Sequence, residues 1–101
     1  MNFYALDIET TGFDFNHPIQ IAAVRYENGS VVESFNQYYK AEIKLTRKAI
    51  DIHGLTKEEL KAKGAIKWTK GASEILVNFL SEHPDLPIMV HNEYYDHWKV
   101  L

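Results

Sequence analysis

The pair Asn28-Gly29 restricts the fold of this 101-residue chain more than any other feature. Both residue types tolerate the positive φ angles of a two-residue hairpin turn. The pair lies between two segments rich in β-favouring residues, 19–26 and 31–39. A third such segment, residues 2–9, precedes them and contains Phe, Tyr, Leu and Ile. The pattern predicts an antiparallel meander of three strands.

The sequence after residue 45 carries helix signals. Thr46 can cap a short helix that runs to Ile52, and residues 56–59 (Thr-Lys-Glu-Glu) have the form of a capping box. Gly64 can end the helix that this box begins. A longer amphipathic helix is predicted over residues 70–81, because four of its apolar residues share one face.

The last segments predict one more strand and one more helix. Residues 88–90 form a short apolar run typical of a buried strand. Residues 93–101 predict the start of a helix, because Tyr94, Trp98 and Leu101 lie three to four positions apart. The order of elements is typical of an α/β fold. We expect residues 1–101 to form a single, partial domain that is truncated at its C-terminus.

Composition excludes several classes of protein. The chain is 46% hydrophobic and 25% charged, which is typical of a packed globular protein. It contains no cysteine, which excludes disulfides, thiolate zinc sites and a cysteine nucleophile. No apolar run is long enough to span a membrane, and the first residues do not resemble a secretory signal. We therefore expect a cytoplasmic protein without a membrane partner.

The charge is distributed unevenly along the chain. Residues 40–70 contain nine Lys and Arg against four Asp and Glu, a net +5, whereas the other residues contain two against ten, a net −8. This asymmetry suits a protein that holds phosphates in one region and cations in another. The alternative is a solvated helical surface that is rich in lysine.

Asp7 and Glu9 are the first candidates for a functional site. Side chains at positions i and i+2 of a strand project from the same face, so these two carboxylates lie together. Neighbouring carboxylates repel each other unless a positive charge joins them, and Mg²⁺ or Mn²⁺ prefers such oxygen ligands. The alternative is that the strand ends at Ile8 and that Glu9 is solvated.

Asp7 and Glu9 belong to the first of four short sequence matches that follow one another along the chain. The four matches are Asp7-Ile8-Glu9-Thr10-Thr11-Gly12 with the apolar run at 19–24, Ile52-His53-Gly54-Leu55-Thr56, His91-Asn92 and Tyr95-Asp96. Together they resemble the DEDD 3′–5′ exonucleases, the family of the epsilon proofreading subunit of bacterial DNA polymerase III. The resemblance covers essentially the whole chain. It implies a ribonuclease H-like α/β fold in which residues 88–90 run parallel to the first strand.

The resemblance also implies roles for individual residues. Asp7, Glu9 and Asp96 are similar to three of the four carboxylates that bind two Mg²⁺ or Mn²⁺ ions in this family. Such ions clamp the attacking and leaving oxygens of a phosphodiester. The residues expected to border the terminal nucleotide or face the substrate cleft are Thr10, Thr11, Gly12 and His53.

Two residues of the motifs have alternative interpretations. Without the resemblance, His53 would be interpreted as a surface histidine at a helix end. Asn92 is either a helix N-cap or a pocket residue, with equal support for the two roles. His91 is expected to be structural, and Tyr95 stands where the family usually has phenylalanine.

The family's third motif, which supplies a final carboxylate and a general-base histidine, is not found in the 101 residues. The only histidine in an H-x(4)-D context is His91, and its Asp96 belongs to the family's second motif, which residues 91–96 resemble. General-base assistance contributes about 10²–10⁴-fold in rate. We therefore expect this chain by itself to be a poor catalyst.

Three hypotheses of function follow. The first is a metal-dependent 3′–5′ exonuclease that releases nucleoside monophosphates from a single-stranded 3′ end, with DNA favoured over RNA and a polymerase or helicase as a candidate partner. The second is a catalytically inactive, nucleic-acid-binding or polymerase-associated module of the same fold. The third is a scaffold without a ligand.

Overall fold

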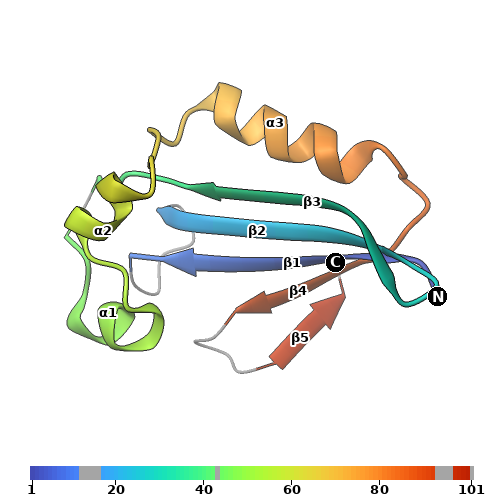
Figure 1. Ribbon diagram of the computed structural model, residues 1–101, viewed down its shortest axis with the longest axis horizontal. Helices are drawn as coiled ribbons and strands as arrows, with labels where there is room; N and C mark the ends of the chain where they lie inside the picture. The colour runs from blue at the N-terminus through green and yellow to red at the C-terminus, as the bar shows by residue number, and fades with distance from the viewer. Residues whose placement is uncertain (12–16, 43, 93–96, 101) are drawn as a thin grey trace.

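The computed structural model describes residues 1–11, 17–42, 44–92 and 97–100, with side chains up to His91. Its elements are β1 (Phe3–Thr10), β2 (Pro18–Glu27), β3 (Ser30–Tyr38), α1 (Arg47–His53), α2 (Lys57–Ala62), α3 (Lys70–Ser81), β4 (Ile88–Asn92) and β5 (His97–Val100). The strands form one sheet in the order β3-β2-β1-β4-β5 (Figure 1).

The predicted meander is confirmed. β1 pairs with β2 and β2 with β3, both antiparallel. The turn between β2 and β3 has positive φ angles at Asn28 (52°) and Gly29 (83°), as the sequence requires. The backbone N–H of Asn28 donates to Oδ1 of Asn2 at 3.1 Å, which ties the turn to the start of the chain.

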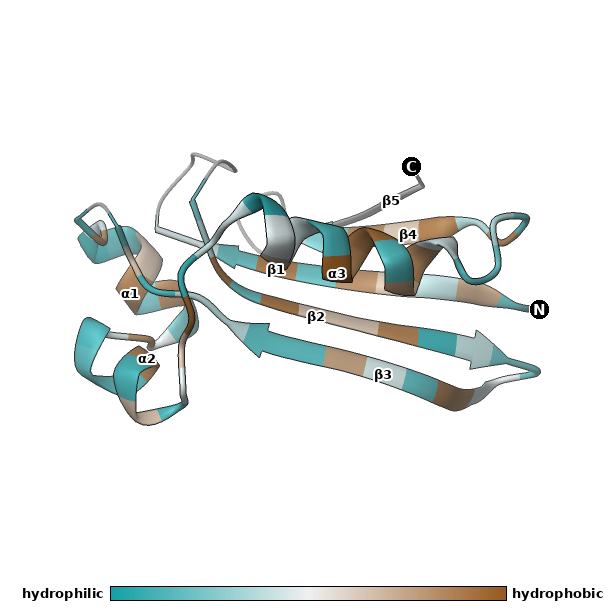
Figure 2. Ribbon diagram, turned by 90° about the horizontal axis from the view of Figure 1, so that it is seen from above, coloured by the Kyte–Doolittle hydropathy of each residue, from teal (hydrophilic) through white to brown (hydrophobic). Residues whose placement is uncertain are grey.

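The predicted parallel strand is also confirmed. β4 pairs with β1 in parallel, with Asp7 opposite His91. The chain reaches β4 through the three helices, and α3 lies along one face of the sheet (Figure 2). The hydroxyl of Tyr4 donates to the carbonyl of Phe79 at 3.1 Å, which joins β1 to α3.

The predicted helix over residues 93–101 is wrong at residues 97–100. These residues form β5, which pairs antiparallel with β4 from Met89 opposite Val100 to Asn92 opposite His97. A helix of nine residues is marginal without packing, whereas β5 gives partners to backbone groups of β4 that would otherwise form a sheet edge. The tryptophan and valine of this segment also favour a strand. Residues 93–96 and 101 lie outside the described residues.

Both predicted helix caps are confirmed. Thr46 caps α1, its Oγ1 accepting from the N–H of Ala49 at 3.1 Å, and Thr56 caps α2 in the same way. α1 extends one residue beyond Ile52 to His53, and Gly64 has the positive φ of 76° expected where α2 ends. The helix predicted over residues 70–81 matches α3.

Two hydrophobic clusters hold the layers together. The larger one lies between the sheet and α3 and contains the buried residues Leu6, Ile21, Ala23, Tyr39 and Ala72. The smaller one contains the buried residues Ile19, Leu45, Leu55 and Leu60. It fixes α1 and α2 at the end of the sheet where β1 ends (Figure 1).

Among the described residues, no helix is both long enough and apolar enough to cross a bilayer.

Candidate active site

The two faces of β1 have different roles. Tyr4 and Leu6 are buried on the face that packs against α3. Asp7 and Glu9 alternate with them and therefore project from the opposite face. The side chain of Asp7 is 42% exposed, whereas Glu9 is 8% exposed. This burial pattern is compatible with the prediction that Asp7 and Glu9 share one face of the strand. It does not fit the alternative in which Glu9 is solvated.

Parallel pairing brings the second motif beside the first. His91 in β4 lies opposite Asp7 in β1, and its Nδ1 is 3.4 Å from Oδ1 of Asp7. A ring N–H at Nδ1 can donate to this carboxylate. The sequence predicts a structural role for His91, and this contact also allows the ring to orient Asp7. The two residues are 84 positions apart, so no local pattern could have indicated their contact.

Thr10 ends β1 and Thr11 follows it, and each of the two is about 1% exposed. The N–H of Thr11 donates to the carbonyl of His17 at 3.2 Å, and the carbonyl of Thr11 accepts from the N–H of Thr46 at 2.9 Å. Among the described residues, the hydroxyl of Thr11 has no hydrogen-bond partner. The expected contact of both threonines with a terminal nucleotide stays a prediction, and Gly12 lies outside the described residues.

His53 connects the helical region to the end of β1. Its Nδ1 accepts from the N–H of Leu55 at 3.0 Å, so the ring proton lies on Nε2, 3.1 Å from the carbonyl of Thr10. The ring therefore fixes the turn between α1 and α2 against the strand that carries the carboxylates. Sequence reasoning missed this anchoring role, and the expected contact with substrate stays a prediction.

The remaining predicted site residues are only partly described. Asn92 is the last residue of β4 and pairs with His97 of β5, so the helix that it was expected to cap does not continue through residues 97–100. Asp96, the predicted third carboxylate, lies outside the described residues. Its approach to Asp7 and Glu9 stays a prediction.

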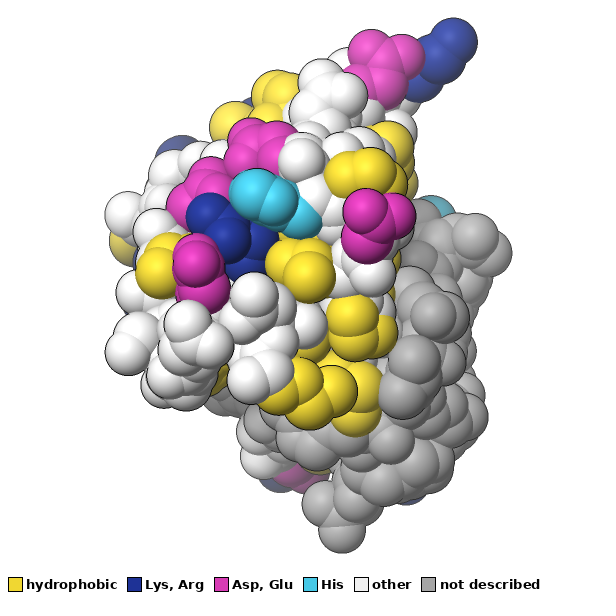
Figure 3. All heavy atoms as spheres, turned by 90° about the vertical axis from the view of Figure 1, so that its right-hand side faces the viewer, with side chains coloured by type: hydrophobic (Ala, Val, Ile, Leu, Met, Phe, Trp, Pro, Cys, Tyr) yellow, Lys and Arg dark blue, Asp and Glu magenta, His cyan; other side chains and the backbone are white. Residues whose placement is uncertain are grey.

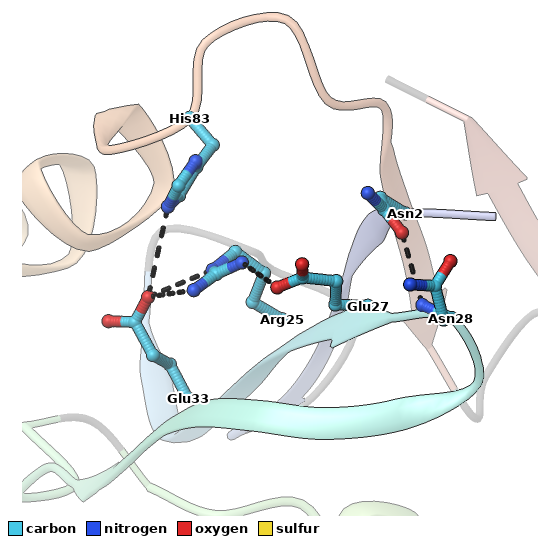
Figure 4. A network of polar contacts seen from close by, with 6 residues as sticks. All are labelled: Asn2, Arg25, Glu27, Asn28, Glu33 and His83. Carbon is cyan, nitrogen blue, oxygen red and sulfur yellow. Dashed lines mark hydrogen bonds and ion pairs between the residues drawn. The ribbon is translucent and has the colours of Figure 1, made fainter.

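A second polar cluster, missed by the sequence analysis, lies on the α3 face of the sheet. Arg25 pairs with Tyr4 across β1 and β2 and so shares its face. Its Nε and Nη2 donate to Oε1 of Glu33 at 2.8 and 2.6 Å (Figure 4). Glu82 and His83 follow α3 and complete the cluster. Figure 3 shows acidic side chains and a histidine gathered at this end of the molecule.

Hydrogen bonds shift the acidities within this cluster. The guanidinium of Arg25 lowers the pKa of Glu33, and a hydrogen bond to Glu82 lowers it further. The same carboxylate raises the pKa of Glu82 through that hydrogen bond and its negative charge. The ligand atoms of Glu33, Glu82 and His83 lie within 4.8 Å of one another, but Arg25 already neutralises Glu33. The cluster joins α3 to the hairpin and faces away from Asp7.

The model of the exonuclease family RNase_T matches residues 4–101. This chain belongs to that exonuclease family. The match confirms the predicted resemblance to DEDD 3′–5′ exonucleases. Members of the family generally use divalent metal ions.

Curated relatives of this RNase_T chain are polymerases. It is 34% identical over 97 residues to the PolC-type DNA polymerase III of Thermotoga maritima and 28% identical over 96 residues to that of Halalkalibacterium halodurans. These matches cover 94% and 93% of the chain but 7% and 6% of the relatives. The chain thus spans a small fraction of their length.

Solved structures share the fold. Cell-death related nuclease 4 (CRN-4) aligns with a TM-score of 0.62 and 24% identity, over 88% of this chain and 34% of that one. Exonuclease X in complex with 5′ overhanging duplex DNA aligns with a TM-score of 0.59 and 17% identity, over 76% and 42%. The predicted ribonuclease H-like fold is confirmed.

The described carboxylates suit the ions that this family uses. Asp7 and Glu9 offer hard oxygen ligands from one face of one strand, as Mg²⁺ and Mn²⁺ prefer. Asp7 is accessible from solvent, and His91 can hold its carboxylate in one orientation. Among the described residues, these two carboxylates do not belong to a group of three close ligands.

Proposed function

We propose that this chain contributes the front part of a metal-dependent 3′–5′ exonuclease site that releases nucleoside monophosphates. The observation that carries the proposal is the contact between Asp7 and His91, because it joins the first and second exonuclease motifs across β1 and β4. Family membership supports hydrolysis of nucleic acid. The direction of digestion and the need for metal are part of the proposal.

Asp7, Glu9 and Asp96 would hold two Mg²⁺ or Mn²⁺ ions. When bound, the ions would supply a clamp on the attacking and leaving oxygens of an in-line displacement. Asp7 reaches solvent and can take a ligand, whereas buried Glu9 is restricted in its movement. His91 would keep the carboxylate of Asp7 in one orientation by donating from Nδ1.

The terminal nucleotide would lie beside the end of β1. Thr10, Thr11 and Gly12 directly follow the carboxylates and would border it, with Asn92 contributing from the end of β4. His53 would hold the backbone of Thr10 in place. None of these residues is assigned as the general base, because the resemblance places that histidine in the family's third motif.

The proposed substrate is a single-stranded 3′ end. DNA is favoured over RNA because the curated relatives are DNA polymerases. A polymerase that carries or binds this domain, or a helicase, is the proposed partner. A cytoplasmic location stays a prediction.

Binding of Mn²⁺ tests the proposal. Asp7→Asn should abolish binding measured by calorimetry or by electron paramagnetic resonance, since it removes a charged ligand. Glu82→Gln is the matched control, because it changes one carboxylate in the cluster on the other face. Equal binding by the wild type and Asp7→Asn would overturn the proposal. Loss of binding in Glu82→Gln alone would place the ion beside Arg25.

A further inference from the structure

Three adjoining hollows follow one another around α1 and α2. The largest, of about 630 Å³, is lined by Lys44, Leu45, Thr46, Arg47 and Ile50. The next, of about 270 Å³, shares Lys44, Leu45 and Ile50 with it and adds Thr56, Lys57 and Glu58. The third, of about 250 Å³, shares Lys57 and adds Lys40, Ala41, Leu60, Lys61 and Ala65. The shared residues make the three hollows one continuous surface.

This surface is strongly basic. Its lining contains five exposed cations, which we call the basic belt: Lys40, Lys44, Arg47, Lys57 and Lys61. The same lining contains one carboxylate, that of Glu58. The lining therefore carries a net +4, in a chain whose total charge is −3, and creates a local positive potential that attracts polyanions.

The basic belt begins beside the strand that carries the carboxylates. Thr46 lines the first hollow, and its N–H donates to the carbonyl of Thr11 at 2.9 Å. Thr11 follows Glu9 by two residues, a span of at most about 7 Å in extended chain. His53 adds a second tie from α1 to Thr10. A nucleic-acid strand whose 3′ end reaches Glu9 could therefore continue onto the basic belt.

The floor of the hollows is aliphatic and firmly held. Leu45 and Leu60 line the hollows and belong to the smaller hydrophobic cluster, with exposed fractions of 7% and 1%. Ile50 packs against this cluster and lines the two larger hollows. Cations beside fixed apolar surface suit a ligand that has both phosphates and base faces. A purely acidic peptide would use the cations alone.

The geometry points to the basic belt as a track for the backbone of single-stranded nucleic acid, next to the carboxylate site and independent of base sequence. This inference rests on the proposed function, because it places the continuing strand beside the proposed catalytic end. Binding through phosphates releases counterions, so affinity falls with salt. Five contacts on a single strand give a slope of log affinity against log salt of about −3.5.

The test measures fluorescence anisotropy of labelled oligothymidylate with the 101-residue chain, in chelator so that no strand is cleaved. The wild type should lose about 100-fold in affinity between 50 and 200 mM salt, and Lys44→Gln with Lys57→Gln about 20-fold, because two contacts are gone. Lys67→Gln with Lys70→Gln is the matched control, since both lysines are exposed and lie outside the lining of the belt. The control should retain the wild-type slope.

Equal slopes in the two double variants would overturn the inference. If poly-glutamate competes as well as oligothymidylate at equal charge, the belt is a site for an acidic protein and the inference also fails. Arg47→Gln provides a second variant should the lysine pair unfold, and melting temperatures check each protein. Asp7→Asn should bind the oligonucleotide normally in chelator, so a failure of the metal site is distinguishable from a failure of the belt.

Discussion

Nδ1 of His91 lies 3.4 Å from Oδ1 of Asp7, across the parallel pair formed by β4 and β1. The histidine is 21% exposed at its side chain and the aspartate 42%, so the contact lies at the edge of the solvent-accessible face. A carboxylate held at one oxygen has fewer orientations available. Its other oxygen is then presented in a defined direction.

Removal of this contact should weaken metal binding. A hydrogen bond of this type is worth about 1 kcal/mol, so His91→Ala should lower Mn²⁺ affinity by about 5-fold. His91→Asn should retain affinity close to that of the wild type, because its amide can donate from a similar position. Electron paramagnetic resonance of Mn²⁺ measures both. His83→Ala is the control, and equal losses in His91→Ala and His91→Asn would contradict a role for this donor.

Replacement of His53 should destabilise the chain. His53→Ala leaves the N–H of Leu55 and the carbonyl of Thr10 without the partners that they have in the structure. Such losses cost about 1–3 kcal/mol when the groups are shielded from water. Urea unfolding measures the change, and His83→Ala, at an exposed position, should remain close to the wild type. A wild-type unfolding midpoint for His53→Ala would show that the anchor is dispensable.

The cluster around Arg25 should make stability depend on pH. The folded state raises the pKa of Glu82, mainly through the hydrogen bond that its protonated carboxyl donates to Glu33. A raised pKa contributes stability that is present below the unfolded value of about 4.3 and lost as pH rises through the folded value. Arg25 lowers the pKa of Glu33, whose contribution is present above its unfolded value and lost as pH falls through the folded one.

Glu82→Gln should remove the first of these effects, because its neutral amide can still donate to Glu33. The melting temperature of this variant relative to that of the wild type should therefore increase as pH rises from about 4.3 towards neutrality. The other charged groups of the cluster, Glu27 and His83, stay in place in both proteins. A constant difference in melting temperature over this range would contradict a hydrogen bond in which protonated Glu82 donates to Glu33.

Catalysis by the 101-residue chain should be slow. The resemblance assigns the general base to a third motif, which these residues do not contain. Joining the segment that follows the matched region in the Thermotoga maritima polymerase should raise the rate by about 10²-fold or more. Stepwise shortening of 5′-labelled DNA, with Mn²⁺ present, measures it. Rapid digestion by the unextended chain would show that the general base is one of the histidines within the 101 residues.

Local chemistry made much of this fold predictable from sequence. Asn28 and Gly29 determine the hairpin, and Thr46 and Thr56 determine where helices begin, because each acts on backbone groups within a few positions. Period-two alternation likewise places Asp7 and Glu9 together.

Only the tertiary structure decided the features that depend on distant partners. Residues 97–100 became a strand because β4 supplied backbone partners for them, a contact that the helical spacing of their side chains could not indicate. His53 became an anchor of Thr10, His91 a neighbour of Asp7, and Arg25 the centre of an ion-pair cluster through contacts between separate elements. The charge of residues 40–70 was visible in the sequence. Its arrangement as a belt beside Thr11 follows from the folding of α1 and α2 against the end of the sheet.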